Sequence, residues 1–269
     1  ATTLTVSGRD LSVLMDLEEK NEPYRNQPDG VIAARLLAAY AQHGLVPAPA
    51  QTTDVPIETQ RVPQQAGTDL AFLRQMATRN GFVFYVQPLG FGAALGYWGP
   101  ENRGGTLQPA LTVGMGPHGN VKGLHFSTDA LAVVGMTGSI LEPNLGITLP
   151  IPALPSLRIP PLALSPLPAR RTRVSRDTAQ KSAGTAALSL VAASTAAPDP
   201  VRGNGELDAV RYGRVLRARE LVGVRGAGFT HDGPYYVESV SHSLAMGRFS
   251  TQFSLKREGT GSLLPLLPT

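Results

Sequence analysis

Strict alternation of side-chain type over residues 248–256 is the feature that most constrains how this chain folds. In an extended conformation, successive side chains point to opposite sides. One side then carries Phe249, Thr251, Phe253 and Leu255, and the other carries Arg248, Ser250, Gln252, Ser254 and Lys256. This pattern predicts a half-buried antiparallel strand with one apolar and one polar face.

Two further runs near this strand predict its partners. Residues 235–244 are rich in β-forming side chains, and the link at 245–247 is short enough to join both runs as a hairpin, with Gly247 free to adopt a positive φ. Residues 221–225 form a third run, connected through the turn-favouring sequence at 231–234. We therefore expect a three-stranded antiparallel meander.

The first half of the chain mixes helices with strands. Residues 9–19 predict a helix capped by Asp10, with a charged, solvated tail. Residues 29–43 predict the clearest helix, for which Asp29 is placed to serve as the cap.

A second helix–strand unit follows. Thr68 is expected to cap a helix that runs through Asn80 and ends at Gly81, followed directly by an apolar strand at 82–86. The glycine-rich segment 91–106, which contains Trp98, predicts a loop, and its spacing fits no phosphate-binding motif.

Closely spaced prolines separate the two halves of the chain. Residues 143–168 carry a proline every few positions, which excludes a helix and predicts a semi-rigid, polyproline-like connector. An alanine-rich helix, capped by Asp177 or Thr178, is expected after it. The predicted division is an α+β domain at 1–142, a connector at 143–172, a helix and β-barrel domain at 173–259, and a tail at 260–269.

Composition narrows the classes of function. The chain has no cysteine, which excludes disulfides, thiolate nucleophiles and cysteine-ligated metals. Its net charge of +4 is mild for 269 residues, and motifs for nucleic-acid recognition are missing. The sequence shows neither a signal peptide nor an apolar run of membrane-spanning length. We expect a protein that is made in the bacterial cytoplasm and does not insert into a membrane.

Candidate catalytic groups are few. The five histidines lack metal-site spacing, and the pair His231-Asp232 is better explained as a turn than as part of a catalytic triad. Glu142, Asp208 and Glu238 stay open as carboxylates that could meet as a glycosidase pair. The sequence predicts no enzyme activity, no cofactor and no metal.

Several strings resemble one family. They are TLTVSGRDLSVLMDLEEK, DGVIAARLLAAY, TDLAFLRQMATRNGFVFYV and LVGVRGAGFTHDGPYYVESVSHSLAMGRFSTQFSLKREG, in this order across most of the chain. Together they look like the baseplate hub proteins of phage tails and contractile injection systems. This group includes the phage late control protein D family and is related to the N-terminal region of type VI secretion spikes.

The resemblance implies a mainly β fold with α+β insertions, in which tube-like antiparallel β-barrel domains and a small α/β domain assemble as a trimeric ring. It implies a structural hub that joins the tail tube to the central spike, contacts other baseplate components and encloses a lumen for cargo or DNA. Family members usually carry about one barrel's worth of sequence before the first of these strings. The alternatives are a tail-associated peptidoglycan hydrolase and the spike protein itself.

Under this resemblance, the residues of the closing hairpin become candidate structural or interface positions. The polar face at 248–256 is the expected lumen or ring-contact surface. The candidates are Arg248, Ser250, Gln252, Ser254, Lys256, Phe249, Phe253, Tyr236 and Gly233.

Overall fold

The computed structural model describes residues 4–52, 54–56, 58, 61–142, 147–154, 158–175 and 183–263. Strands make up 44% and helices 20% of it, which confirms a mainly β fold with helical insertions. The chain forms two compact units, each built from three segments. Unit 1 comprises Ala1–Glu101, Gly138–Pro152 and Ser175–Ala196, and unit 2 comprises Asn102–Thr137, Ala153–Val174 and Ala197–Thr269. This division differs from the contiguous domains that the sequence predicts.

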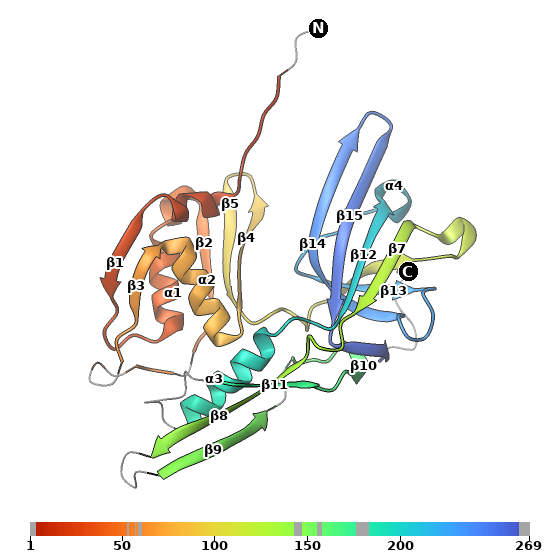
Figure 1. Ribbon diagram of the computed structural model, residues 1–269. Helices are drawn as coiled ribbons and strands as arrows, with labels where there is room; N and C mark the ends of the chain where they lie inside the picture. The colour runs from red at the N-terminus through yellow and green to blue at the C-terminus, as the bar shows by residue number, and fades with distance from the viewer. Residues whose placement is uncertain are drawn as a thin grey trace. The chain divides into compact units, whose positions relative to one another are not determined.

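Unit 1 combines two small sheets with three α-helices (Figure 1). Its 3-10 helices are η1 (Leu11–Asp16) and η2 (Ala41–His43), and its α-helices are α1 (Asp29–Ala38), α2 (Asp69–Asn80) and α3 (Ala183–Ala196). Its strands are β1 (Glu19–Pro23), β2 (Leu45–Pro49), β3 (Gln64–Thr68), β4 (Val83–Gly90) and β5 (Ala93–Gly99). Strands β1 and β3 pair with each other, and β2, β5 and β4 form a mixed three-stranded sheet in that order.

The ends of α2 follow the sequence prediction. The Thr68 hydroxyl accepts a hydrogen bond from the backbone N–H of Ala71 at 3.2 Å, and Gly81 ends the helix in the left-handed region with φ +67°. A side chain at Gly81 would also lie 2.9 Å from the carbonyl oxygen of Ala192 in α3. Glycine therefore serves both the helix end and the close packing of α2 against α3.

Asp29 has a different role from the predicted cap. Pro28 occupies the N-cap position of α1, and Asp29 is its first residue. The Asp29 carboxylate accepts hydrogen bonds from Arg79 Nη2 at 2.6 Å and from Asn80 Nδ2 at 2.7 Å. It thus joins the start of α1 to the end of α2, a partnership that no local pattern indicates.

Two segments of unit 1 that the sequence predicts as helix tail and loop are strands. Residues 19–23 form β1, because Lys20 turns inward and the strand pairs in register with β3. Residues 93–99 form β5, in which Trp98 is fully buried and donates from its indole N–H to the carbonyl of Leu73 at 3.0 Å. A side chain at Gly96 would lie 3.1 Å from both Leu37 and Leu45. Close packing therefore explains why glycine occupies this strand.

Asp69 is a buried carboxylate in unit 1 with three side-chain hydrogen-bond donors. It is 1% exposed, and its carboxylate accepts hydrogen bonds at 2.7 Å from Lys20, Tyr40 and Gln65. Burial acts to raise the pKa of the Asp69 carboxyl, but the hydrogen bonds from Lys20, Gln65 and Tyr40 outweigh it and hold this pKa below its ordinary value.

We expect Asp69→Asn to lower the free energy of unfolding at pH 7 by about 1–3 kcal/mol, because bonds to a charged acceptor are lost. The lowered pKa of Asp69 in the folded state means that its contribution is complete above about pH 5. That contribution is lost as the pH falls through the folded-state pKa. Denaturant titrations at pH 7 and pH 3, followed by Trp98 fluorescence, should show that acidification lowers the free energy of unfolding less in the variant than in wild type. Equal acid sensitivity in both proteins would contradict this role.

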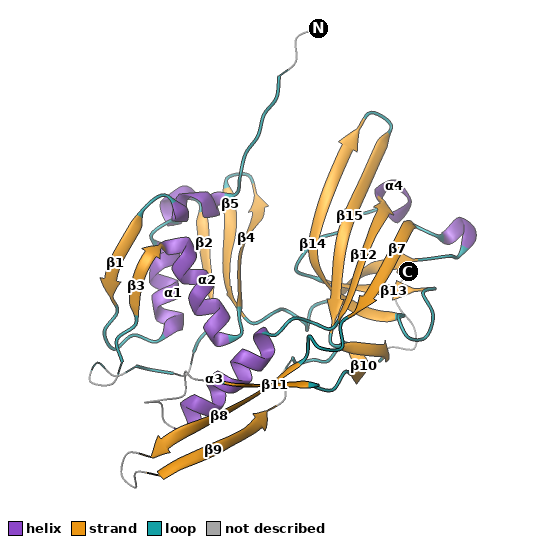
Figure 2. Ribbon diagram, viewed as in Figure 1, coloured by secondary structure: helices purple, strands orange, loops and turns teal. Residues whose placement is uncertain are grey.

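Unit 2 is built on a six-stranded sheet that curls into a half-barrel (Figure 2). The strand order is β6 (Leu107–Thr112), β13 (Leu221–Arg225), β14 (Gly233–Ala245), β15 (Arg248–Arg257), β12 (Val201–Asp208) and β7 (Val121–Thr128). The other elements of this unit are η3 (Gly116–His118), β10 (Ala163–Pro166), β11 (Arg171–Val174), α4 (Ala209–Tyr212) and β16 (Gly259–Ser262). Strands β8 (Val134–Glu142) and β9 (Ile147–Leu154) carry residues of both units.

The predicted meander is confirmed. Strands β13, β14 and β15 are neighbours in this order and pair antiparallel. A two-residue turn, Met246 and Gly247, joins β14 to β15, and Gly247 has φ +72°. The apolar side of β15 packs into the core, where Thr251, Phe253 and Leu255 are buried.

The proline-rich stretch is not only a connector. Strands β9 and β10 lie within it, and β10 pairs antiparallel with β16. Leu162 and Ala163 are each 2% exposed. Proline is tolerated because each strand of a two-stranded sheet has one unpaired edge. A proline whose missing N–H would face that edge removes no hydrogen bond between strands. Residues 143–146 and 155–157, the predicted caps Asp177 and Thr178, and residues 264–269 of the predicted tail lie outside the described residues.

Candidate functional surface

The β14–β15 hairpin extends beyond its neighbour β12. Pairing between β12 and β15 ends at Ser250, whereas β14 and β15 stay paired to Arg248. The tip carries two exposed apolar side chains, Leu244 at 76% and Met246 at 105% of full exposure. Arg248 is also exposed there, and its guanidinium lies 3.4 Å from the carboxylate of Glu206. The two apolar side chains at the tip are therefore exposed next to a cation and are not packed into a core.

The predicted polar face of β15 is open only in part. Arg248 and Gln252 are exposed, whereas Ser250 is buried at 6%. Ser254 donates a hydrogen bond to Asn204 of β12 at 2.7 Å and is half-buried. Ser254 thus contacts the neighbouring strand β12, although the alternation pattern alone predicts that it faces solvent.

Of the four remaining predicted positions, all but Phe249 lie at the base of the hairpin or in its core. Tyr236 is fully buried beneath Lys256, whose Nζ lies 5.2 Å from the centre of the tyrosine ring. Gly233 has φ +125°, and a side chain there would lie 2.9 Å from Arg257. Phe253 is 3% exposed and Phe249 is half-buried. Phe249 lies near the tip, where it pairs with Leu244, and the other three positions shape the hairpin base or its core rather than an outer surface.

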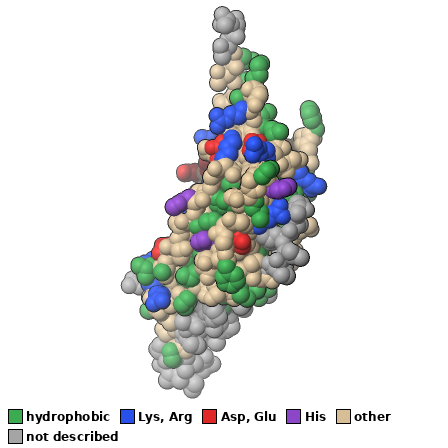
Figure 3. Space-filling view, turned by 90° about the vertical axis from the view of Figure 1, so that its right-hand side faces the viewer, with side chains coloured by type: hydrophobic (Ala, Val, Ile, Leu, Met, Phe, Trp, Pro, Cys, Tyr) green, Lys and Arg blue, Asp and Glu red, His purple; other side chains and the backbone are tan. Residues whose placement is uncertain are grey.

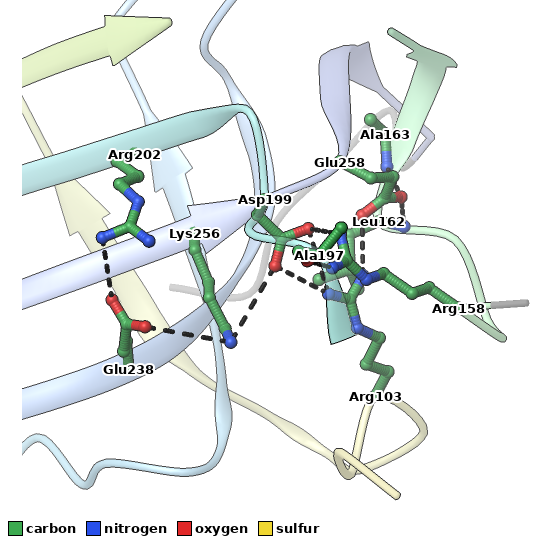
Figure 4. A network of polar contacts seen from close by, with 10 residues as sticks. All are labelled: Arg103, Arg158, Leu162, Ala163, Ala197, Asp199, Arg202, Glu238, Lys256 and Glu258. Atoms are coloured by element: carbon green, nitrogen blue, oxygen red, sulfur yellow. Dashed lines mark hydrogen bonds and ion pairs between the residues drawn. The ribbon is translucent and has the colours of Figure 1, made fainter. Parts of the chain in front are cut away.

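A buried network of charges holds this base together (Figure 4). The side chain of Asp199 is 0% exposed and lies among three cations. Arg103 donates to it at 3.1 and 3.3 Å, Arg158 also pairs with it, and Lys256 lies 3.9 Å away. Arg158 additionally donates to the carbonyl of Ala197. The carboxylate of Asp199, in the loop before β12, therefore links this loop to β15 and to the segments that carry Arg103 and Arg158.

Glu258 extends the network at the junction of β15 and β16. Its carboxylate accepts from Arg103 Nη1 at 2.7 Å and from the backbone N–H groups of Leu162 and Ala163. These contacts seat the proline-rich segment against β16. The network was missed by sequence reasoning because its members are up to 155 residues apart and follow no motif.

A second buried cation fixes the turn before β14. Arg257 is 0% exposed and donates to three carbonyl oxygens, of Thr230, Asp232 and Gly259, at 2.7, 3.0 and 2.8 Å. Its guanidinium also lies 4.2 Å from the ring centre of Tyr235. Burial lowers the pKa of this guanidinium from its ordinary value. The side chain therefore acts as a fixed donor that ties the turn before β14 to the start of β16.

The His231-Asp232 pair is part of this turn. The His231 ring stacks on Phe126 with centroids 4.3 Å apart, and Asp232 accepts from the backbone N–H of Ala227 at 2.8 Å. Burial lowers the pKa of His231. The two side chains have separate partners, and this arrangement supports the predicted turn.

The carboxylates considered as a glycosidase pair are apart. Asp208 pairs in register with Ser250, and Glu238 lies beside Lys256, six residues along β15. At about 3.3 Å per residue this separation is roughly 20 Å, beyond the 5–9.5 Å or so that the reaction needs. The side chain of Glu142 lies outside the described residues. Among the residues that the structure describes, no group of three or more histidines and carboxylates could hold a metal. Within the same ranges, every helix falls short of the length and apolar character needed to cross a bilayer.

Comparison with solved structures identifies proteins of the same fold. The tail protein from Neisseria meningitidis MC58 aligns with a TM-score of 0.60 and 15% identity, over 93% of this chain and 73% of that one. The 43 kDa tail protein of prophage MuSo2 from Shewanella oneidensis aligns with a TM-score of 0.58 and 15% identity over the same shares. No protein-family model and no curated protein matches the sequence. The chain therefore shares its fold with these two tail proteins.

Proposed function

We propose that this protein is a structural hub of a phage tail or contractile injection system, a homotrimer that joins the tail tube to the central spike. The observation that carries this proposal is the shared fold with two phage tail proteins across 93% of the chain. The curled, open sheet of unit 2 is consistent with the proposal, because a ring of copies related by closed symmetry can cover sheet edges that one copy leaves open.

The function is mechanical. The buried charge network and the β-sheet ladders supply a rigid body, and the exposed hairpin supplies contact surface. In the assembled ring, Arg248 and Gln252 line the lumen or a ring contact. The other partners are the spike, the tube, further baseplate proteins, and the cargo or DNA that passes through the lumen.

The apolar tip of the hairpin gives a testable prediction. We expect the double variant Leu244→Ser, Met246→Ser to lose assembly while its unfolding free energy stays within about 0.5 kcal/mol of wild type, because both side chains are exposed. Size-exclusion chromatography with light scattering measures the first property and thermal melting the second. Val174→Ser, a 72% exposed position of unit 2, is the matched control and should assemble normally.

The mass of the purified protein tests the proposal itself. A hub should elute at three times the chain mass of 28.4 kDa and should bind the spike and tube proteins encoded beside it. A protein that stays monomeric at every concentration and binds neither would contradict it. Clearing of cell-wall material by the pure protein would instead favour a hydrolase.

A further inference from the structure

An arginine-rich loop follows β12 in unit 2. Residues 211–219 read RYGRVLRAR, and the side chains of Arg211, Arg214 and Arg217 are exposed. Basic side chains are visibly more frequent than acidic ones on the face shown in Figure 3. In the described part of the chain, Arg214 and Arg217 form no ion pair, and Arg211 has only a distant one, 3.9 Å from Asp208.

This loop is held firmly in place. Gln108 clamps the backbone of Arg217, accepting from its N–H at 2.8 Å and donating to its carbonyl at 2.9 Å. The Tyr212 hydroxyl donates to the carbonyl of Pro109 at 2.7 Å, and Leu216 is fully buried. Because the backbone is fixed, presenting the arginines to a partner costs little backbone conformational entropy.

Two hollows flank the loop. One, of about 510 Å³, is lined by Arg211 and Arg225, together with His118 and without a carboxylate. The other, of about 490 Å³, is lined by Arg214 and Arg217, with Glu220 at its wall. Both are open and large enough to receive acidic side chains.

The same chain carries an acidic segment in unit 1, residues 18–22, with three glutamates and one lysine. Glu18, Glu19 and Glu22 are exposed and form no ion pair in the ranges that the structure describes. The only basic residue between them, Lys20, pairs with the buried Asp69 at 2.7 Å. The pKa of Lys20 is raised, mainly by this hydrogen bond. The segment therefore presents three exposed carboxylates along and beside β1, and its one lysine is hydrogen-bonded to Asp69.

We propose that the arginine loop of one copy binds the acidic segment of a second copy of this chain. The two surfaces are opposite in charge and equal in number of charges, because one carries three exposed arginines and the other three exposed glutamates. The two surfaces are different patches of the chain, so a contact between them is heterologous, and contacts of this kind form a ring when the rotation between copies closes. This inference rests on the proposed hub function and names the contact that would build its trimer.

A nucleic-acid partner fits the same charges less well. The only aromatic side chain in the loop, Tyr212, is buried and hydrogen-bonded, so no aromatic surface is offered to bases. A polyanion would also leave the acidic segment uncompensated, whereas a second copy satisfies both surfaces.

Charge reversal in the full chain tests the contact. Arg211→Glu, Arg214→Glu, Arg217→Glu should raise the concentration needed for half-assembly at least about tenfold, since like charges then face each other. Glu18→Lys, Glu19→Lys, Glu22→Lys should do the same. Combining all six changes should restore assembly, which a purely structural role of either surface would not produce. Light scattering across a dilution series at low salt is the readout, with circular dichroism to confirm folding.

The control triple Arg170→Glu, Arg171→Glu, Arg173→Glu makes the same change in net charge at exposed positions and should assemble as wild type. If wild type is trimeric and both reversals leave it so, the contact is wrong while the hub stands. If wild type is never trimeric, the hub itself fails. Binding of a labelled DNA duplex that the arginine reversal abolishes, with assembly unchanged, would also overturn the inference.

Discussion

Asp199→Asn should destabilise unit 2 by about 3–5 kcal/mol, because removing the charge of one partner in a buried ion network leaves buried positive charge less well compensated. Asn preserves the shape of the side chain but not its charge. Arg103, whose side chain is 2% exposed, and Arg158 would both lose the negative charge that Asp199 now places beside them. The loop before β12, the end of β15 and the segment that carries Arg158 should loosen together.

The two units can be followed separately in this experiment. The only tryptophan, Trp98, lies in unit 1, so its fluorescence reports that unit alone. Hydrogen exchange of the backbone amides of β12 and β15, measured by mass spectrometry, reports unit 2. We expect faster exchange in unit 2, and a shift in its unfolding midpoint, with little change in Trp98 fluorescence.

Glu206→Gln is the matched control. Glu206 also lies near two cations, Lys122 and Arg248, but at the surface. These ion pairs should therefore contribute little to the free energy of unfolding, and the variant should have the same unfolding midpoint as wild type. Equal effects of the two substitutions, or a wild-type midpoint for Asp199→Asn, would show that the network does not support unit 2.

Arg257→Met should have an effect of similar size. The substitution removes the Arg257 donor from the carbonyls of Thr230, Asp232 and Gly259. The Thr230 carbonyl keeps the backbone N–H of Gly261 at 3.1 Å, whereas each carbonyl that is left buried and unpaired costs roughly 1–3 kcal/mol. The expected loss is about 3–5 kcal/mol in unit 2, after partial relaxation of the turn. Amides of β14 and β16 should exchange faster than those of β7.

Arg248→Met is a control on the same strand. Arg248 is exposed and pairs with Glu206 only at 3.4 Å, so its replacement should cost about 0–1 kcal/mol. Arg257→Lys should fall between the two, since an ammonium keeps the charge but cannot reproduce the planar arrangement of donors. A midpoint for Arg257→Met that equals that of Arg248→Met would contradict this role for the buried guanidinium.

Local chemistry made part of the fold predictable. The hydroxyl cap at Thr68, the left-handed stop at Gly81 and the two-residue turn at Gly247 depend on neighbours in sequence, and all three are present. The alternation in β15 predicted its buried face, because burial of that face removes Phe253 and Leu255 from water.

Partners distant in sequence decided the rest. Residues 19–23 look like a solvated helix end until Lys20 meets Asp69 across 49 residues. Segment 93–99 looks like a loop in the sequence, but Gly96 packs closely against Leu37 and Leu45. The core contacts of Asp199 and Glu258 have no local signature either. The arginine loop did have one, because RYGRVLRAR contains four arginines in nine residues.

The position of this chain in an assembled particle tests the hub most directly. A cryo-electron microscopy map of the tail or injection apparatus should contain three copies around the axis, between the last ring of the tube and the spike, with the β14–β15 hairpins at subunit contacts. A map that places the chain away from the axis, or in a copy number other than three, would contradict the hub.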